Sequence, residues 1–555
     1  MHEELIAVLK ESFPDYELDY ESLLEKPKTP EHGDIALPVF TLAKTLRKSP
    51  MQIAQDMASQ LAGNLPASIK EVKAVGPYVN FRLNEGNLAQ ELLDKDKGGS
   101  LTDPCSLQAN KTSQTVLLEW PSPNSNKPLH IGHGRNMLMG KSLANLLEKN
   151  GAKVIRVNLN NDRGIAICKS MLMYKLFGDG KTPESENRKS DYFVGDYYLL
   201  FEAKSKENPD YEKQAQDMLV KWEAGDEEVH ALWEKMNAWA FAGHNATYTI
   251  FGVEHDKAYY ESQIYTKGKD TIMQGLEKGL FYKDADNGNI VCDLEDKGYG
   301  QKVLLRGDGT SIYMTQDIAL AKEKVDDFGE CDKYVFVVGN EQAYHFQVLF
   351  EVLSRLGFGN TDRFYHFAYG MIGLPEGKMS SRKGNVIYAD ELIAELVAEA
   401  EENLKSRELT ADLADEERKR RAHAIAMGAL TFFILKFNPL SNFVFDKKQA
   451  LSFEGETGPY LMYTYARIQS ILRKEAVPQD VPVPDVLEEK TARLIKILHG
   501  YAPMLAESAK DYKVSAVVLY LVKIAQAFNE FYHSCPILKS EGDRKSTRLN
   551  SSHYS

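Results

Sequence analysis

The stretch LEWPSPNSNKPLHIGHGRNMLMGKSL (118–143) carries the pattern that decides the fold. The apolar run TVLLEW (115–120) suits a buried parallel strand, and a helical pattern follows over residues 135–150. Gly151 then stops the helix, and KVIRVNLN (153–160) reads as a second strand. We therefore predict a strand–helix–strand unit with a right-handed crossover in a parallel sheet.

The loop between this strand and this helix holds His130 and His133 on either side of Gly132. In an open parallel sheet, ligands bind beyond the carboxyl ends of strands, where helix N-termini offer free N–H groups. Gly132 lets a ligand approach the backbone closely. A metal would need a third ligand that is absent nearby, and a single loop histidine is most often a polar surface residue. The loop is therefore a candidate ligand site.

Composition indicates a soluble, multidomain, cytoplasmic chain. Its 555 residues are 43% hydrophobic and 26% charged, and the net charge of -13 excludes wholesale coating of nucleic acid but not a local basic groove. The five cysteines form no CxxC pair, which favours a reduced compartment without a thiolate zinc site. We find no signal peptide and no segment that approaches a membrane span, so no membrane association is expected.

Three regions follow one another along the chain. Residues 1–108 combine helical and strand-like patterns and end in a polar linker, and residues 113–400 form an α/β domain with an irregular insertion at about 178–290. From about residue 404 the pattern is almost wholly helical, and we place a third domain at 404–542.

The loop HIGH (130–133) and the distant GKMSSRKGN (377–385) resemble, in this order, the two signatures of class I aminoacyl-tRNA synthetases. Other stretches, among them FVGDYY, LRGDGTSIYMTQD, VVGNEQAYHF and GPYLMYTYARIQSILRK, resemble the arginyl-tRNA synthetase family along nearly the whole chain. The resemblance implies an α/β fold: a Rossmann-like catalytic domain, an N-terminal α+β appended domain and an all-α anticodon-binding domain.

The resemblance implies two reaction steps, in which arginine first attacks the α-phosphate of ATP and the tRNA ribose then attacks the adenylate. Negative charge gathers on phosphate oxygens, so catalysis rests on positioned donors rather than on a covalent nucleophile. By this resemblance the catalytic residues are His130, His133, Lys378 and Lys127. The ATP-binding residues are His130, Gly132, His133, Lys378, Ser380 and Ser381. Mg²⁺ is expected to enter with ATP, with no metal site built by the protein.

Arginine recognition requires carboxylates, because a guanidinium is planar, permanently charged and pairs with them in a bidentate manner. The family pattern maps arginine binding onto Glu119, Asn124, Tyr313, Asp317 and Gln342. On spacing alone, an acidic residue at the end of a strand is equally consistent with a structural role that stabilises the fold. The chain departs from the family at two positions, Gln316 in place of the usual Arg and Gly134 in place of Leu.

By the same resemblance, tRNA binding falls on Asn80, Phe81 and Arg82 in the first domain and on Tyr460, Tyr463 and Arg467 in the third. An aromatic side chain beside a cation suits stacking on an unpaired base, although a core position for Phe81 explains the pattern at least as well. Spacings of three and four place the second trio on one helix face, which is alternatively the edge of a core. The run ERKRR (417–421) is more typical of a solvated helix face.

The last thirteen residues, DRKSTRLNSSHYS (543–555), are polar and aperiodic and resemble a translated sequencing adapter. We expect this tail to be foreign and disordered, and the natural chain to be truncated near Gly542.

The resemblance implies an arginine–tRNA ligase, which we expect to act as a monomer on tRNA(Arg), arginine and ATP. Another nucleotidyl transferase with the HIGH signature is one alternative, but it would not need the helical third domain. A non-catalytic tRNA-binding paralogue is the other, and loss of signature residues would have favoured it.

Overall fold

The computed structural model describes residues 2–97, 114–309, 311–373, 386–406, 413–452, 454–474, 482–484 and 486–535. These residues form two compact units. Unit 1 contains the described residues of 1–107, 464–504 and 520–555, and unit 2 contains those of 108–463 and 505–519.

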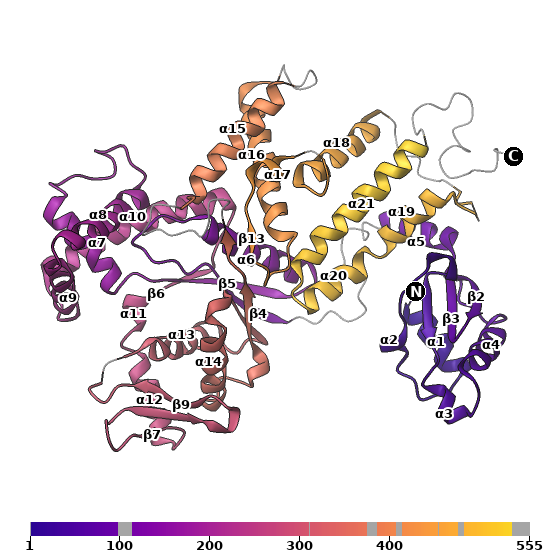
Figure 1. The fold of residues 1–555 in the computed structure, drawn as a ribbon, viewed down its shortest axis with the longest axis horizontal. Coiled ribbons are helices and arrows are strands. Elements are labelled where there is room, and N and C mark those ends of the chain that lie inside the picture. The colour runs from indigo at the N-terminus through magenta and orange to yellow at the C-terminus, as the bar shows by residue number, and fades with distance from the viewer. Residues whose placement is uncertain are drawn as a thin grey trace. The chain divides into compact units, whose positions relative to one another are not determined.

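Unit 2 is built on a five-stranded parallel sheet (Figure 1). Its strands are β4 (Thr115–Glu119), β5 (Lys153–Asn160), β6 (Lys257–Tyr260), β10 (Lys333–Gly339) and β11 (Phe364–Tyr369). The order across the sheet is β11-β10-β4-β5-β6, and each neighbouring pair is parallel. The predicted strand–helix–strand unit is confirmed as β4, helix α6 (Ile131–Lys149) and β5.

The central strands are apolar because helices cover them. Helix α6 packs against β4, β5 and β10, and Gly140 lets it lie directly on the ring of Trp120, which follows β4. A hydrophobic core cluster contains Leu117 of β4, Ile318 of α13 (Tyr313–Phe328) and Leu349 of α14 (Ala343–Arg355). Burial on both faces explains why these strands read as continuous hydrophobic runs.

The region predicted as an irregular insertion, about 178–290, is mostly regular. After α7 (Ile165–Phe177) it forms α8 (Ser190–Glu207), α9 (Asp210–Glu223) and α10 (Glu227–Phe251). It then supplies β6, an edge strand of the parallel sheet. The boundary predicted near residue 290 is therefore wrong, because residues 257–260 belong to the sheet itself.

The remaining elements of unit 2 are smaller or lie after the sheet. Strands β7 (Tyr282–Lys283), β8 (Ile290–Leu294) and β9 (Gly300–Leu305) form an antiparallel sheet of their own. The others are α11 (Glu261–Ile264), α12 (Gly268–Glu277), η3 (Glu295–Lys297), η4 (Asn340–Gln342), η5 (Thr361–Arg363), β12 (Ile372–Gly373), α15 (Ala389–Lys405), α16 (Asp415–Leu435), β13 (Phe443–Val444) and α17 (Lys447–Leu451).

Unit 1 contains an antiparallel sheet in the order β1-β3-β2, formed by Ile35–Pro38, Tyr78–Leu83 and Ile69–Val75. Its N-terminal helices are α1 (His2–Ser12), α2 (Tyr20–Leu23), α3 (Leu42–Leu46), α4 (Pro50–Leu61) and α5 (Glu85–Lys97), with η1 at Pro30–His32. Helix α19 (Glu489–His499) packs on α5, and Lys496 of α19 pairs with Asp34 and Glu85 at 2.9 Å each. The predicted division, with all of 404–542 in one domain, therefore does not coincide with these units.

Three further helices, α18 (Gly458–Lys474), α20 (Tyr501–Lys510) and α21 (Val514–Ser534), complete the described chain. By length and composition alone, α21 is the one helix in the described ranges that could cross a membrane. The expectation that no segment approaches a membrane span is wrong by these criteria, which a core helix also meets.

Candidate active site

The candidate site lies where the chain reverses its direction of winding across the sheet. From β4 the chain moves to β5 on one side, whereas β10 lies on the other side of β4 and leads on to β11. The loops after β4 and β10 therefore leave neighbouring strands at their carboxyl ends in opposite directions. Such a switch point opens a crevice in which ligands of parallel α/β sheets bind.

The loop after β4 presents its two histidines at the start of α6. His130 is the N-cap residue, and its Nδ1 accepts the N–H of Gly132 at 3.0 Å. Nδ1 of His133 accepts the N–H of His130 at 3.1 Å, and the two rings lie 4.0 Å apart. A Cβ on Gly132 would lie 2.8 Å from His130 Cε1, so only glycine permits this arrangement.

These hydrogen bonds fix the protonation of both rings. A neutral imidazole whose Nδ1 accepts a hydrogen bond carries its proton on Nε2. Burial, with Lys127 nearby, lowers the pKa of His130 to about 4, and burial lowers the pKa of His133 well below its usual value. At neutral pH both rings are therefore uncharged and have Nε2–H as donor.

Lys127 lies just before these histidines, and its charge contributes to lowering the pKa of both. Nε2 of His244, on α10, lies 2.9 Å from the backbone oxygen of Lys127 and holds that part of the loop. The structure thus brings Lys127, His130 and His133 together at the start of α6.

The second signature does not belong to the part of the chain that the structure describes. Lys378, Ser380 and Ser381 lie outside the described residues.

Glu119 is buried at the end of β4, but it already has a cationic partner. Lys324 of α13, 1% exposed, forms an ion pair with its Oε2, and Ser122 donates to its Oε1 at 3.4 Å. Because a paired carboxylate is a weaker attractor for a second cation, direct binding of the arginine guanidinium to Glu119 is disfavoured in this arrangement.

The other predicted arginine-binding residues lie around the same edge. Asn124 extends the pairing of β4 with β5 through a bridge to Asn161, Tyr313 begins α13 and is 82% exposed, and Gln342 is exposed in η4 after β10. Asp317, one turn beyond Tyr313, has its Oδ2 2.6 Å from Nε2 of His345 on α14.

The structure adds Glu261, which the sequence did not single out. Glu261 begins α11 directly after β6, and its Oε1 accepts the amide of Gln316 at 3.1 Å. Burial raises its pKa to about 7, with Arg163 opposing and Asp162 and Asp317 adding to the rise. The departure from the family pattern at Gln316 was the one sequence signal that touched this acid; Nη1 of Arg163 also lies 3.9 Å from Oε1 of Glu261.

In unit 1 the structure contradicts part of the predicted RNA contact. Phe81 is 0% exposed and belongs to the core cluster, and Asn80 is also buried. A fully buried ring cannot stack on a base, so the core interpretation of Phe81 is the correct one. Arg82 donates to the backbone oxygen of Glu31 at 2.9 Å. The accessible aromatic residue here is Phe40, which is 50% exposed and contacts Tyr78 edge-to-face.

The predicted trio on α18 is only partly exposed. Tyr463 is 48% exposed, and Tyr460 is half-buried. Arg467 donates to Asn529 at 2.6 Å and lies over the ring of Tyr532. In the ERKRR run, Lys419, Arg420 and Arg421 are exposed, and Glu417 pairs with Arg420 and Arg421, whereas Arg418 is 12% exposed and pairs with Glu401.

Within the described ranges, no cluster of three or more histidine, cysteine or acidic side chains has the arrangement of a metal site.

Comparisons with protein families match three successive parts of the chain. Residues 100–447 match "tRNA synthetases class I (R), catalytic domain". Residues 461–553 match "DALR anticodon binding domain", which includes most of the tail expected to be foreign. Residues 1–83 match "Arginyl tRNA synthetase N terminal domain".

Individual proteins agree with these matches. The arginine–tRNA ligase of Treponema denticola is 45% identical over 95% of this chain and 90% of its own length. That of Bacteroides thetaiotaomicron is 42% identical over 94% and 90%. Among solved structures, Thermus thermophilus arginyl-tRNA synthetase has a similar fold, with a TM-score of 0.82, 24% identity and coverage of 99% of this chain and 95% of its own.

Proposed function

The chain belongs to the class I arginyl-tRNA synthetase family and is an arginine–tRNA ligase, and we propose that it performs both reaction steps at the carboxyl edge of β4 and β10. In the first step, the carboxylate of arginine attacks the α-phosphorus of ATP and pyrophosphate leaves. In the second step, a hydroxyl of the terminal tRNA ribose attacks the adenylate carbonyl and AMP leaves. The observation that carries the assignment is the pair of neutral, Nε2-donating histidines at this switch point.

His130 and His133 serve the first step as electrostatic donors. Negative charge builds up on the phosphate oxygens as the arginine carboxylate attacks, and fixed N–H donors stabilise it without reorganising. Because the lowered pKa makes each ring a weak base and each Nδ1 already accepts a backbone N–H, neither ring serves as a general acid or base. Lys127 adds a positive charge near the phosphates, and the family resemblance assigns Lys378, Ser380 and Ser381 to the pyrophosphate. Mg²⁺ enters as part of the Mg–ATP substrate.

Asp317 and Glu261 are the best-placed acids for the guanidinium. They stand on neighbouring elements, and the charge of Asp317 repels that of Glu261 and contributes to its raised pKa; Arg163, whose Nη1 lies 3.9 Å from Oε1 of Glu261, only partly offsets this repulsion. A bound guanidinium would pair with both and relieve that repulsion. Tyr313, Gln342 and Asn124 then contribute hydrogen bonds to the bound arginine. Glu119 does not bind arginine directly but stabilises the site through its ion pair with Lys324.

For tRNA, we assign contacts to the exposed residues of the predicted set, Arg82 on β3 and Tyr463 on α18. Arg467 and Tyr460 shape the helix face on which Tyr463 stands. We further propose that the protein acts as a monomer, because the candidate site is assembled within one chain, and that it acts in the cytoplasm, where charged tRNA is used in translation.

The test is to charge a tRNA mixture with each of the twenty amino acids in separate reactions. Arginine alone should be attached, in a reaction that depends on ATP and releases AMP. Attachment of another amino acid, or no attachment by a folded and active preparation, would contradict the assignment. A variant with His130→Ala serves as the matched control, because it removes one phosphate donor and leaves the arginine-binding carboxylates intact.

A further inference from the structure

The loop that carries the histidines is tied to a distant segment of unit 2. The N–H of Ile131 donates to the backbone oxygen of Ile387 at 3.0 Å, and the N–H of Ala389 donates to that of Leu129 at 2.9 Å. His130 therefore faces Tyr388 in an isolated antiparallel bridge. Segment 387–389 follows, in the sequence, directly on the second signature and leads into α15.

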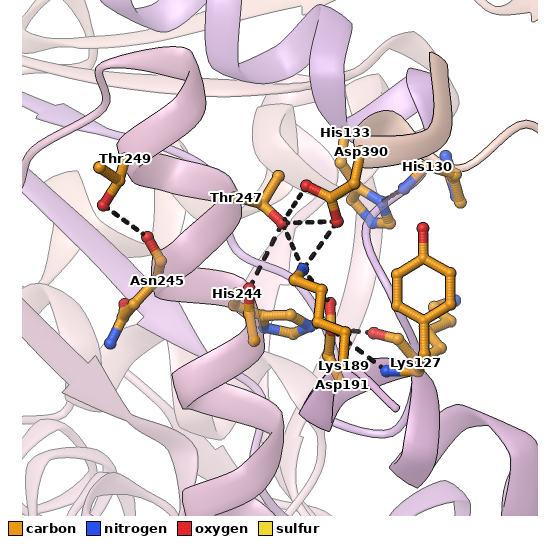
Figure 2. A network of polar contacts seen from close by, with 12 residues as sticks. Lys127, His130, His133, Lys189, Asp191, His244, Asn245, Thr247, Thr249 and Asp390 are labelled. Atoms are coloured by element: carbon orange, nitrogen blue, oxygen red, sulfur yellow. Dashed lines mark hydrogen bonds and ion pairs between the residues drawn. The ribbon is translucent and has the colours of Figure 1, made fainter. Parts of the chain in front are cut away.

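A partly buried polar cluster holds the start of α15 in place (Figure 2). Lys189, the N-cap residue of α8, donates to Asp191 at 3.0 Å, to Asp390 at 2.7 Å and to Thr247 at 2.8 Å. The hydroxyl of Thr247 lies 3.0 Å from each carboxylate oxygen of Asp390. We call these four residues the Lys189 cluster; they join α8, α10 and α15.

Two of these helices also contact the histidine loop directly. Gly195 of α8 admits Pro128, since a Cβ there would lie 2.6 Å from the proline Cδ. Gly243 of α10 admits Asp191 in the same way, with 2.4 Å to its Cγ. The next residue on α10, His244, lies with its Nε2 2.9 Å from the backbone oxygen of Lys127. The helices that fix Asp390 thus also fix the residues just before His130.

The chemistry of the Lys189 cluster is better suited to orienting the backbone at Asp390 than to stabilising the fold. Asp191 is fully buried, and a single ammonium lies between its carboxylate and that of Asp390. Buried ion pairs are weak evidence for stability, because apolar residues of similar volume often serve as well. Directional hydrogen bonds to one carboxylate, however, set the position and rotation of the backbone that carries it.

We propose that Lys189 is a positioning residue for adenylate formation, which acts through Asp390 and segment 387–389 to fix the orientation of His130. The inference rests on the proposed role of His130 as a phosphate donor.

The principal variant is Asp390→Asn, which retains the Lys189–Asp191 pair and the shape of the side chain. In ATP–pyrophosphate exchange with tRNA(Arg) present, we expect kcat to fall about ten- to a hundredfold, as for small misplacements of catalytic groups. KM for arginine should stay unchanged. Glu399→Gln, on the exposed face of the same helix, is the matched control and should behave as wild type. Lys189→Arg should retain more activity than Lys189→Met.

A double-mutant cycle separates positioning from a merely structural role. If Lys189 acts through His130, then Asp390→Asn should cause little further loss in a protein that already carries His130→Ala. An equal fold-loss in both backgrounds would overturn the proposal, as would an unchanged kcat in Asp390→Asn. Should Asp390→Asn fail to fold, Thr247→Val removes the hydroxyl that donates to Asp390 and accepts from Lys189, keeps both ion pairs and enters the same cycle. Failure of the proposed function is distinguishable, because the wild-type protein would then show no arginine-dependent exchange.

Discussion

Nε2 of His345 lies 2.6 Å from Oδ2 of Asp317, so a candidate partner of the substrate guanidinium already has a partner within the protein. The hydrogen bond to Asp317 raises the pKa of His345 above its usual value. A protonated His345 competes with arginine for Asp317, and a neutral His345 does not. The occupancy of this carboxylate is thus coupled to pH.

We expect KM for arginine to fall as pH rises from about 6 to about 8, by about tenfold or more. Two groups change in the same direction: His345 loses its proton and releases Asp317, and Glu261, with a pKa of about 7, gains its negative charge. The guanidinium stays protonated throughout. Measuring KM for arginine across this range, at saturating ATP and tRNA, tests the sign.

Two variants separate the contributions. Glu261→Gln should raise KM for arginine at about pH 8 and flatten the profile, while KM for ATP stays unchanged. His345→Gln should lower KM at about pH 6, because Asp317 is then never paired with a cation. A profile identical in the wild type and both variants would mean that neither carboxylate binds the guanidinium.

Removing either histidine of the loop should lower the rate of adenylate formation by about 10²–10³-fold, the usual cost of losing one fixed donor to a developing negative charge. His130→Ala and His133→Ala remove an Nε2–H donor each. Because both rings are neutral, the wild-type kcat should show no titration from these groups between about pH 6 and about pH 8. Single-turnover adenylate formation reports the loss, and near-normal rates in both variants would refute the assignment.

The sequence predicted correctly those strands and helices whose formation depends on neighbouring residues in the chain. The strand over 115–120, the helix after it and the strand over 153–160 each follow from apolar periodicity and turn residues, and all three are present. Strand β6 is only four residues long, with charged and aromatic side chains, so nothing in its own sequence marks it as part of the sheet.

The site residues that were missed depend on partners far away in the chain. Lys324 neutralises Glu119 across 205 positions, and Gln316 meets Glu261 across 55. No window of sequence contains both members of either pair. A family motif can mark Glu119 as important, but only the fold shows that its charge is already paired.

Arg135 should contribute more to stability than to catalysis. It is buried in α6 and donates to the backbone oxygens of Gly370, Pro439 and Ser441 at 2.7–3.1 Å. Burial lowers its pKa to about 10, so it stays charged at neutral pH. Arg135→Met removes four hydrogen bonds, leaves the carbonyl of buried Gly370 without the guanidinium, and should destabilise unit 2 by about 2–4 kcal/mol; the carbonyl of Pro439 keeps the N–H of Gly370 as a donor.

Thermal unfolding, together with hydrogen exchange over residues 439–441, measures this effect. Arg363→Met is the control: it breaks a surface pair with Glu330 and should change stability by less than about 0.5 kcal/mol. Equal effects of the two substitutions would show that the carbonyl contacts of Arg135 contribute little.

The last prediction concerns Phe81, where a role in RNA binding and a role in the core give opposite results. Phe81→Leu keeps an apolar side chain in the core but removes the aromatic ring. Because the ring is fully buried, we expect Phe81→Leu to bind tRNA with the wild-type affinity at fixed salt concentration. Phe81→Ala should instead destabilise the N-terminal part of unit 1 by about 3–5 kcal/mol, as large-to-small core substitutions do. Limited proteolysis of the full chain would report the loss. Phe40→Ala, at an exposed ring nearby, should leave stability nearly unchanged. If Phe81→Leu weakened tRNA binding without loss of stability, the ring would have to leave the core on binding, and the stacking role would be restored.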